Sequence, residues 1–151
     1  FCATIDILGE YTLEKEEAKK VTSDYCKLYD EIFENKLDCN ISLKLTHIGL
    51  KISYEQTIDN ISKILSFAKK YKNFLRIDME SSNFTEQTIE IYKYCKARYH
   101  NVGIVIQSYL IRSENDKASC EFFTTIPIFC SKKIIINPRI ASSFTSFKFE
   151  N

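Results

Sequence analysis

The sequence contains no tryptophan, three glycines and two prolines among its 151 residues. The glycines, at positions 9, 49 and 103, lie too far apart to form a glycine-rich phosphate loop. No apolar run approaches the ~18 residues of a transmembrane helix. The net charge of +1 lacks the basic excess that nucleic acids and anionic membranes attract. These absences disfavour a phosphate-binding domain and exclude a membrane-spanning or nucleic-acid-binding one.

Cysteine usage points to reduced thiols. The chain has six widely spread cysteines and no C-x-x-C pair. With 44% hydrophobic residues it can build a core without a disulfide framework, which predicts a reducing compartment. Cys95 and His100 are residue types that bind metals and lie close together in the sequence, but no second pair of such ligands follows. We therefore predict that no metal is bound.

Length bounds the architecture. A chain of 151 residues is about one domain. It is too short for a complete eightfold βα barrel, which needs roughly 200 residues or more.

Up to about residue 112, short apolar runs alternate with longer amphipathic segments. The apolar runs, which predict strands, are 3–8, 41–45, 74–78 and 102–107. The first amphipathic segment repeats apolar residues at helical spacing, at Ala18, Val21, Tyr25, Leu28 and Ile32. Similar patterns predict helices with inward faces at Ile58, Ile61, Leu65 and Ala68, and at Ile89, Tyr92 and Cys95.

Local signals place the helix starts. Ser53, with Gln56 three residues later, forms a capping box, and Thr85 is a predicted N-cap. Four strands separated by three helices indicate parallel βαβ units. The residues alone leave two folds open, a doubly wound sheet or part of a βα barrel.

Polar residues interrupt or end each apolar run, at Asp6, Lys44, Asp78 and Gln107. Because the carboxyl ends of parallel strands meet in the functional crevice, these side chains are expected to form one constellation. Each alone is equally well explained as a buried ion pair or a strand-end cap. Lys44 and Asp78 follow adjacent predicted strands, which favours their mutual pairing.

Three segments in order resemble a known family: ISLKLTHIGL (41–50), FLRIDMESS (74–82) and NVGIVIQSYLIRSENDK (101–117). Together they resemble proline dehydrogenase, most closely its short monofunctional bacterial form. TIDILGE (4–10) is similar to the first barrel strand of that family. Each motif is weak alone, but their shared order and spacing are specific.

The resemblance implies an α/β fold, namely a partial (βα)8 TIM-type barrel of about the first four βα units. It implies an FAD enzyme that transfers a hydride from L-proline to the flavin, giving pyrroline-5-carboxylate. Electrons would then pass to quinone or another acceptor at the membrane. The implied location is the cytoplasm, peripheral at the inner membrane, or the mitochondrion in a eukaryote.

The resemblance also implies roles for individual residues. Lys44 matches the lysine that binds the substrate carboxylate, and an ammonium is a suitable point-charge partner for it. Asp78 matches the catalytic-site aspartate that would hold this lysine charged and oriented. Met79 and Gln107 match positions that contact the flavin, where a neutral amide tunes the ring without adding charge.

Other polar residues receive no role from the match. No catalytic role is carried onto Asp6 or Glu10, and no general-base role onto His47. Arg112 occupies a position that the family also fills with arginine, and helix capping or a surface ion pair explains it equally well.

The match covers residues 1–117, the predicted amino-terminal half of the barrel, and 118–151 form a divergent tail. The family's Lys-Gly-Ala-Tyr strand and paired arginines are not found there, and only 132–137 reads as a strand. We therefore expect a frameshift, a mispredicted exon or an early stop near this point. The alternative function is a truncated, catalytically inactive fragment without bound flavin. An incomplete barrel exposes its first and last strand edges, so we expect poor solubility or dimerisation through them.

Overall fold

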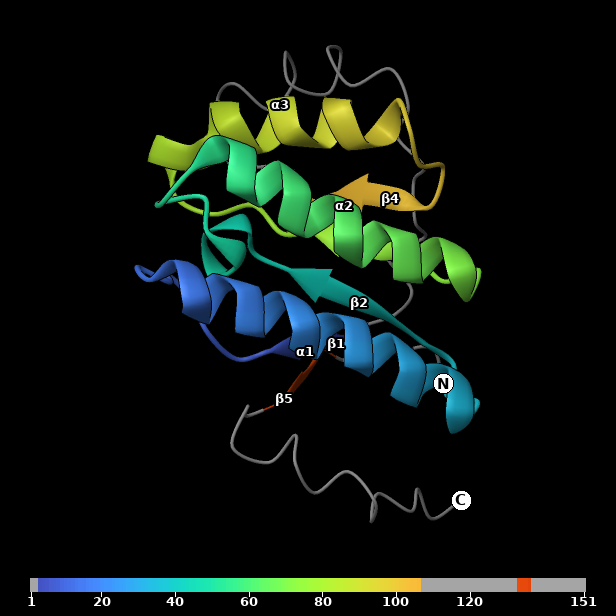
Figure 1. The fold of residues 1–151 in the computed structure, drawn as a ribbon. Helices are drawn as coiled ribbons and strands as arrows, with labels where there is room; N and C mark the ends of the chain where they lie inside the picture. Colours follow the sequence, from blue (N-terminus) through green and yellow to red (C-terminus); the bar gives the residue numbers. More distant parts are fainter. Residues whose placement is uncertain (1–2, 107–132, 137–151) are drawn as a thin grey trace.

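A computed structural model describes residues 3–106 and 133–136 (Figure 1). The strands are β1 (Ala3–Ile7), β2 (Cys39–Leu43), β3 (Leu75–Ile77), β4 (Val102–Ile104) and β5 (Lys133–Ile136). The α-helices are α1 (Lys15–Glu34), α2 (Tyr54–Lys70) and α3 (Thr85–Lys96). Two short 3-10 helices, η1 (Leu45–Ile48) and η2 (Ser82–Phe84), follow β2 and β3.

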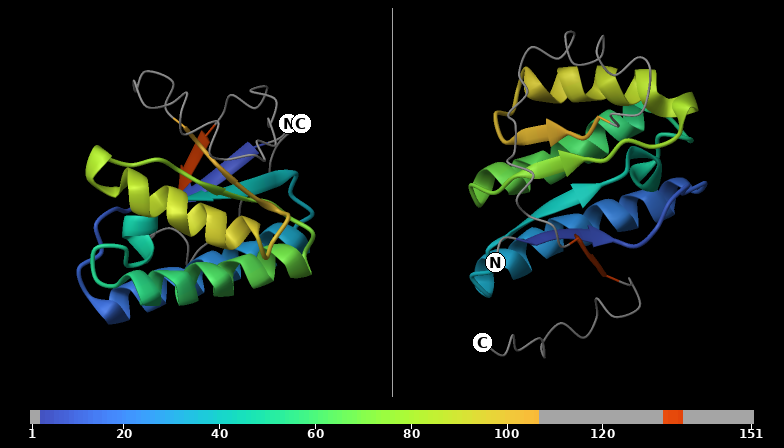
Figure 2. Two further views of the ribbon diagram at one scale, coloured as in Figure 1. Left: turned by 90° about the horizontal axis from the view of Figure 1, so that it is seen from above. Right: turned by 180° about the vertical axis from the view of Figure 1, so that it is seen from behind.

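The strands form one sheet in the order β4-β3-β2-β1-β5, and every neighbouring pair is parallel. Figures 1 and 2 show the three helices side by side in a layer that covers one face of this sheet. This is the arrangement of consecutive βα units in a barrel wall. It confirms the predicted α/β class with parallel strands.

The core lies between the helices and the sheet. In α1, the predicted inward residues Ala18, Tyr25, Leu28 and Ile32 are all buried, while Val21 is half-buried at its margin. From the sheet, Ile41, Leu43, Leu75 and Ile77 are fully buried, and Ile64 and Leu65 of α2 are equally enclosed. The helical periodicity therefore predicted burial correctly. No helix in the described part of the chain is long and apolar enough to cross a membrane.

The helix starts agree with one prediction and correct another. Ser53 is the N-cap of α2, and its Oγ accepts a hydrogen bond from the Gln56 backbone N–H at 3.2 Å. Thr85, predicted as an N-cap, is instead the first residue of α3, and Phe84 precedes it as N-cap. The reason is that η2 runs directly into α3, so the chain is already helical when it reaches Thr85.

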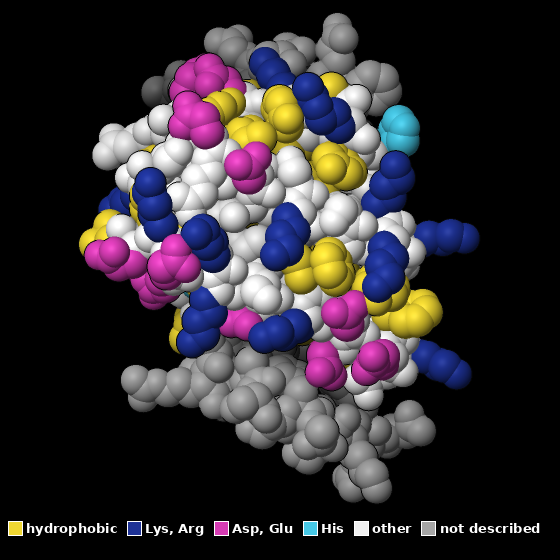
Figure 3. Space-filling model, viewed as in Figure 1, with side chains coloured by type: hydrophobic (Ala, Val, Ile, Leu, Met, Phe, Trp, Pro, Cys, Tyr) yellow, Lys and Arg dark blue, Asp and Glu magenta, His cyan; other side chains and the backbone are white. Residues whose placement is uncertain are grey.

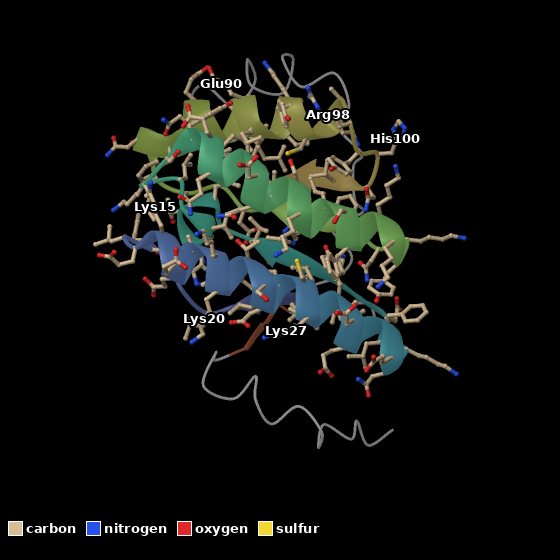
Figure 4. The ribbon with its side chains drawn as sticks, in the orientation of Figure 1. Lys15, Lys20, Lys27, Glu90, Arg98 and His100 are labelled. Atoms are coloured by element: carbon tan, nitrogen blue, oxygen red, sulfur yellow. The ribbon has the colours of Figure 1, made fainter. Side chains whose placement is uncertain are left out.

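The outer faces of the helices carry charges of both signs. Lysine, arginine and acidic side chains are interspersed over the helix layer in Figure 3. Lys15, Lys20 and Lys27 project outward from α1 (Figure 4). Such a mixed surface is typical of a solvated helix face.

One edge of the sheet differs from the expectation. β5 pairs in parallel with β1, with Ile5 opposite Ile134 and Ile7 opposite Ile136. The predicted strand in the tail is thereby confirmed, and the predicted exposure of the β1 edge is wrong because β5 occupies it. Within residues 3–106 and 133–136, no strand pairs with the outer edge of β4. Dimerisation through that edge stays a prediction.

Candidate functional site

The polar residues predicted as one constellation meet where β1, β2 and β3 end. Leu43 lies opposite Ile77 in the β2–β3 ladder, and the Asp78 backbone N–H donates to the Leu43 carbonyl at 2.8 Å. Lys44 and Asp78 therefore leave adjacent strands at the same level. Asp6 lies near the end of β1, so three of the four residues come together. The fourth, Gln107, lies outside the described residues.

Lys44 is held between two carboxylates. Its Nζ lies 3.0 Å from Glu10 Oε1 and 3.7 Å from Asp6 Oδ2. The Asp6 side chain is 4% exposed, the Lys44 side chain 22% and the Glu10 side chain 47%. We call Asp6, Glu10 and Lys44 the Lys44 cluster. It fixes an ammonium group at the strand ends on a side chain that stays partly exposed.

Asp78 has a cationic partner two residues before it in the chain. Arg76 Nε donates to Asp78 Oδ1 at 2.8 Å, and both side chains are largely buried. The structure thus pairs Lys44 with Asp6 and Glu10, and Asp78 with Arg76. Arg76 lies beside Asp78 because residues two apart on a strand point to the same side. Pairing of Lys44 with Asp78 stays a prediction. The R-x-D spacing was the overlooked signal.

Tyr25 connects the helix layer to the Lys44 cluster. Its ring is fully buried, and its hydroxyl donates to Asp6 Oδ1 at 3.2 Å. The paired residues of β1 and β2 end at Ile5 and Ile41, before the ends of both strands, so Asp6, the acceptor of this bond, lies just beyond the last pair. Burial, followed by the charge of Asp6, raises the pKa of Tyr25 well above its ordinary value. The helical spacing of the sequence predicts Tyr25 only as a core residue.

His47 packs edge-on against Tyr25, with ring centroids 6.1 Å apart. The ring is 6% exposed, and burial lowers the pKa of His47 despite the nearby carboxylate of Asp6. This histidine is therefore neutral near pH 7. Its edge-on contact with Tyr25 is a packing contact.

Glu80 binds the turn that follows Lys44. One carboxylate oxygen accepts from the Thr46 backbone N–H at 3.0 Å, and the other accepts from the Thr46 hydroxyl. Burial raises the pKa of Glu80, and the hydrogen bonds from Thr46 oppose that rise. Glu80 ends the RIDME motif, but no sequence pattern indicated its partner.

The other residues that the sequence singled out lie in different places. Met79 is 8% exposed and directly follows Asp78. Arg112, like Gln107, lies outside the described residues. Cys95 is fully buried, which raises its pKa to about 12, whereas His100 lies exposed beyond α3 (Figure 4). In the described ranges no three His, Cys, Asp or Glu side chains are grouped as metal ligands would be.

Comparison with known proteins decides the family. The family model for proline dehydrogenase matches residues 1–120. The chain belongs to the proline dehydrogenase family. Proline dehydrogenase 1 of Bacillus subtilis (strain 168) is 44% identical over 115 residues, which are 76% of this chain and 38% of that protein. Proline dehydrogenase 2 of the same strain is 35% identical over 113 residues, 75% of this chain and 37% of that protein.

This member of the proline dehydrogenase family thus spans less than half the length of the curated relatives it matches. Its fold is similar to part of proline utilization A from Bdellovibrio bacteriovorus, with a TM-score of 0.71 and 24% identity. That similarity covers 78% of this chain and 16% of that one. Proline utilization A from Bradyrhizobium japonicum gives a TM-score of 0.68 at 18% identity, over 76% of this chain and 14% of that one. The expected partial βα barrel is confirmed.

Proposed function

We propose that the protein acts as a proline dehydrogenase, oxidising L-proline to pyrroline-5-carboxylate with FAD. The observation that carries this proposal is the Lys44 cluster. It presents a fixed ammonium, on a partly exposed side chain, at the carboxyl ends of the strands, in a chain of this family. Active sites of βα barrels are built at this end of the strands.

Lys44 would bind the carboxylate of proline. Asp6 is nearly inaccessible, so it stays beside the ammonium. Glu10 is about half exposed and follows the strand, so the substrate carboxylate can take its place against Nζ. Exchange of one carboxylate for another preserves the charge balance around a partly buried lysine.

The described residues fit part of a flavin site. Ser42 Oγ is fully buried, two residues before Lys44, and has no hydrogen-bond partner among the described residues. The buried thioether of Met79, beside Asp78, suits contact with a flat aromatic ring. We propose that Met79 and Gln107 contact the flavin, as in the family pattern. When bound, the flavin would accept the hydride from the carbon beside the ring nitrogen of proline.

The Arg76–Asp78 ion pair places a second pair of fixed charges at the strand ends, next to Met79. We propose that Asp78 is the catalytic-site carboxylate and acts by orienting the groups around the reacting carbon. The onward acceptor would be quinone, which implies a cytoplasmic enzyme peripheral to the inner membrane, or a mitochondrial one in a eukaryote. These finer assignments rest on the family resemblance.

A direct test uses the purified full-length protein. We expect bound-flavin absorbance and dye reduction that depends on L-proline. Lys44→Ala should raise the KM for proline about tenfold or more, since loss of one partner of a partly buried charge pair costs about 2 kcal/mol or more.

Lys27→Ala is the matched control, because Lys27 is a surface lysine paired with Asp24 at 3.3 Å on α1 (Figure 4). Its KM should not change. Absence of both flavin and proline-dependent turnover would contradict the proposed function and favour an inactive fragment. An unchanged KM in Lys44→Ala would contradict the role of Lys44.

A further inference from the structure

Glu80 stands in a motif that identifies the family, yet the proposed chemistry does not use it. Among the described residues its carboxylate forms no salt bridge; it binds the backbone and hydroxyl of Thr46. Thr46 lies in η1, the 3-10 helix whose N-cap is Lys44. Glu80 therefore holds the start of the turn that carries the substrate-binding lysine.

The same threonine also holds the loop that carries Glu10. Thr46 Oγ1 accepts a hydrogen bond from the Tyr11 backbone N–H at 3.3 Å, and the Thr46 carbonyl accepts one from the Thr12 N–H at 3.2 Å. Tyr11 has a left-handed φ of 58°, which costs a non-glycine residue about 1 kcal/mol. The hydrogen bonds to Thr46 hold this conformation in the residue next to Glu10.

These contacts form one chain of hydrogen bonds from β3 through η1 to the loop after β1. We propose that Glu80 is a positioning residue that, through Thr46 and the η1 turn, holds the Lys44 ammonium in place for binding of the substrate carboxylate. This inference rests on the proposed function. Glu80 itself touches neither substrate nor cofactor in this account.

The physical reason is that Lys44 and Glu10 come from separate turns. Lys44 is anchored by β2 on one side and by η1 on the other, and the His47 N–H donates to the Lys44 carbonyl at 3.1 Å. Glu10 follows Gly9 in a loop with an exposed side chain. Without the Thr46 bridge, the η1 turn loses the contacts that fix Lys44 Nζ beside Asp6, where the substrate carboxylate would replace Glu10. Substrate affinity should then fall before the chemical step is affected.

The test measures proline kinetics and thermal unfolding of the full-length flavin-loaded protein in four variants. Glu80→Ala removes both acceptors, and Thr46→Val removes the hydroxyl while keeping the side-chain shape. Glu80→Gln keeps an acceptor for the Thr46 N–H. Glu55→Ala is the matched control, since Glu55 also accepts from a hydroxyl, that of Ser53 at 2.9 Å, but at the start of α2.

We expect Glu80→Ala and Thr46→Val each to raise the KM for proline about fivefold or more, with kcat within about twofold of wild type. Glu80→Gln should recover part of the loss, and Glu55→Ala should leave the KM unchanged. The double variant should be no worse than the poorer single one, because both changes break the same chain of bonds.

The proposal is overturned if Thr46→Val and folded Glu80→Ala leave the KM unchanged while Lys44→Ala raises it. Lower thermal stability with an unchanged KM would overturn it as well, because Glu80 would then act on the fold alone. Should Glu80→Ala fail to fold, Thr46→Val and Glu80→Gln decide. Failure of the proposed function looks different, since Lys44→Ala itself would then have no effect on the KM.

Discussion

Replacing Tyr25 by phenylalanine removes one oxygen from the boundary between the helix layer and the Lys44 cluster. The hydroxyl donates to Asp6 Oδ1 at 3.2 Å. The ring itself is fully buried and keeps its apolar contacts in the variant. The change therefore isolates the hydrogen bond of this hydroxyl from the packing of the ring.

The magnitude follows from the acceptor. A hydrogen bond to a charged group contributes about 1.5–3 kcal/mol, against roughly 1 kcal/mol for a neutral pair. Asp6 is 3% exposed, so water cannot readily replace the lost donor. It keeps Lys44 at 3.7 Å, which limits the loss. We expect Tyr25→Phe to lower the free energy of unfolding by about 2 kcal/mol.

Tyr29 provides a matched control one turn further along α1. It is equally buried, and its hydroxyl donates to a neutral acceptor, the Phe74 carbonyl, at 3.1 Å. Tyr29→Phe should lower the free energy of unfolding by about 1 kcal/mol. Urea denaturation of both variants and wild type, analysed with a common m-value, gives the comparison. A loss for Tyr25→Phe no greater than that for Tyr29→Phe would refute the charged-acceptor argument.

Three further predictions concern stability. Gly9→Ala should destabilise the protein by about 1–3 kcal/mol in urea denaturation, because an added Cβ would lie 2.3 Å from Nε2 of the buried His47 ring; a neutral effect would show that the ring can move. Ser53→Ala should cost about 1 kcal/mol through loss of the α2 N-cap, and an unchanged thermal midpoint would contradict this. Burial lowers the pKa of His47, so the unfolded state binds its proton first and stability should fall as the pH drops below about 6.5. Thermal midpoints at a series of pH values should show a shallower fall in His47→Gln, and equal slopes in the two proteins would argue against this origin.

Sequence periodicity predicted the elements whose residues are buried on one side. Ala18, Tyr25 and Ile32 recur at helical spacing because the sheet covers that face of α1. The polar strand ends were also predictable, since a charge at the end of an apolar run must face a crevice or a partner. For these features the pattern and the physical cause are local.

Side-chain pairing was less predictable because it depends on reach across space. The long stem of Lys44 spans from β2 to Asp6 and Glu10, whereas the shorter Asp78 is neutralised from its own strand by Arg76. The hydrogen bonds between Glu80 and Thr46 of η1 leave no periodic pattern in the sequence. A short strand such as β5 does not specify its neighbour, so its pairing with β1 could not be inferred from 132–137 alone.

The central claim is that the Lys44 ammonium recognises the carboxylate of proline. Wild-type protein should oxidise L-proline with a far higher kcat/KM than pyrrolidine, which has the same ring without the carboxylate. The decisive measurement is this ratio of kcat/KM values in Lys44→Gln, a variant that keeps most of the side-chain length without the charge. We predict that the ratio falls about tenfold or more while pyrrolidine turnover is preserved. An undiminished preference for proline in Lys44→Gln would contradict the account.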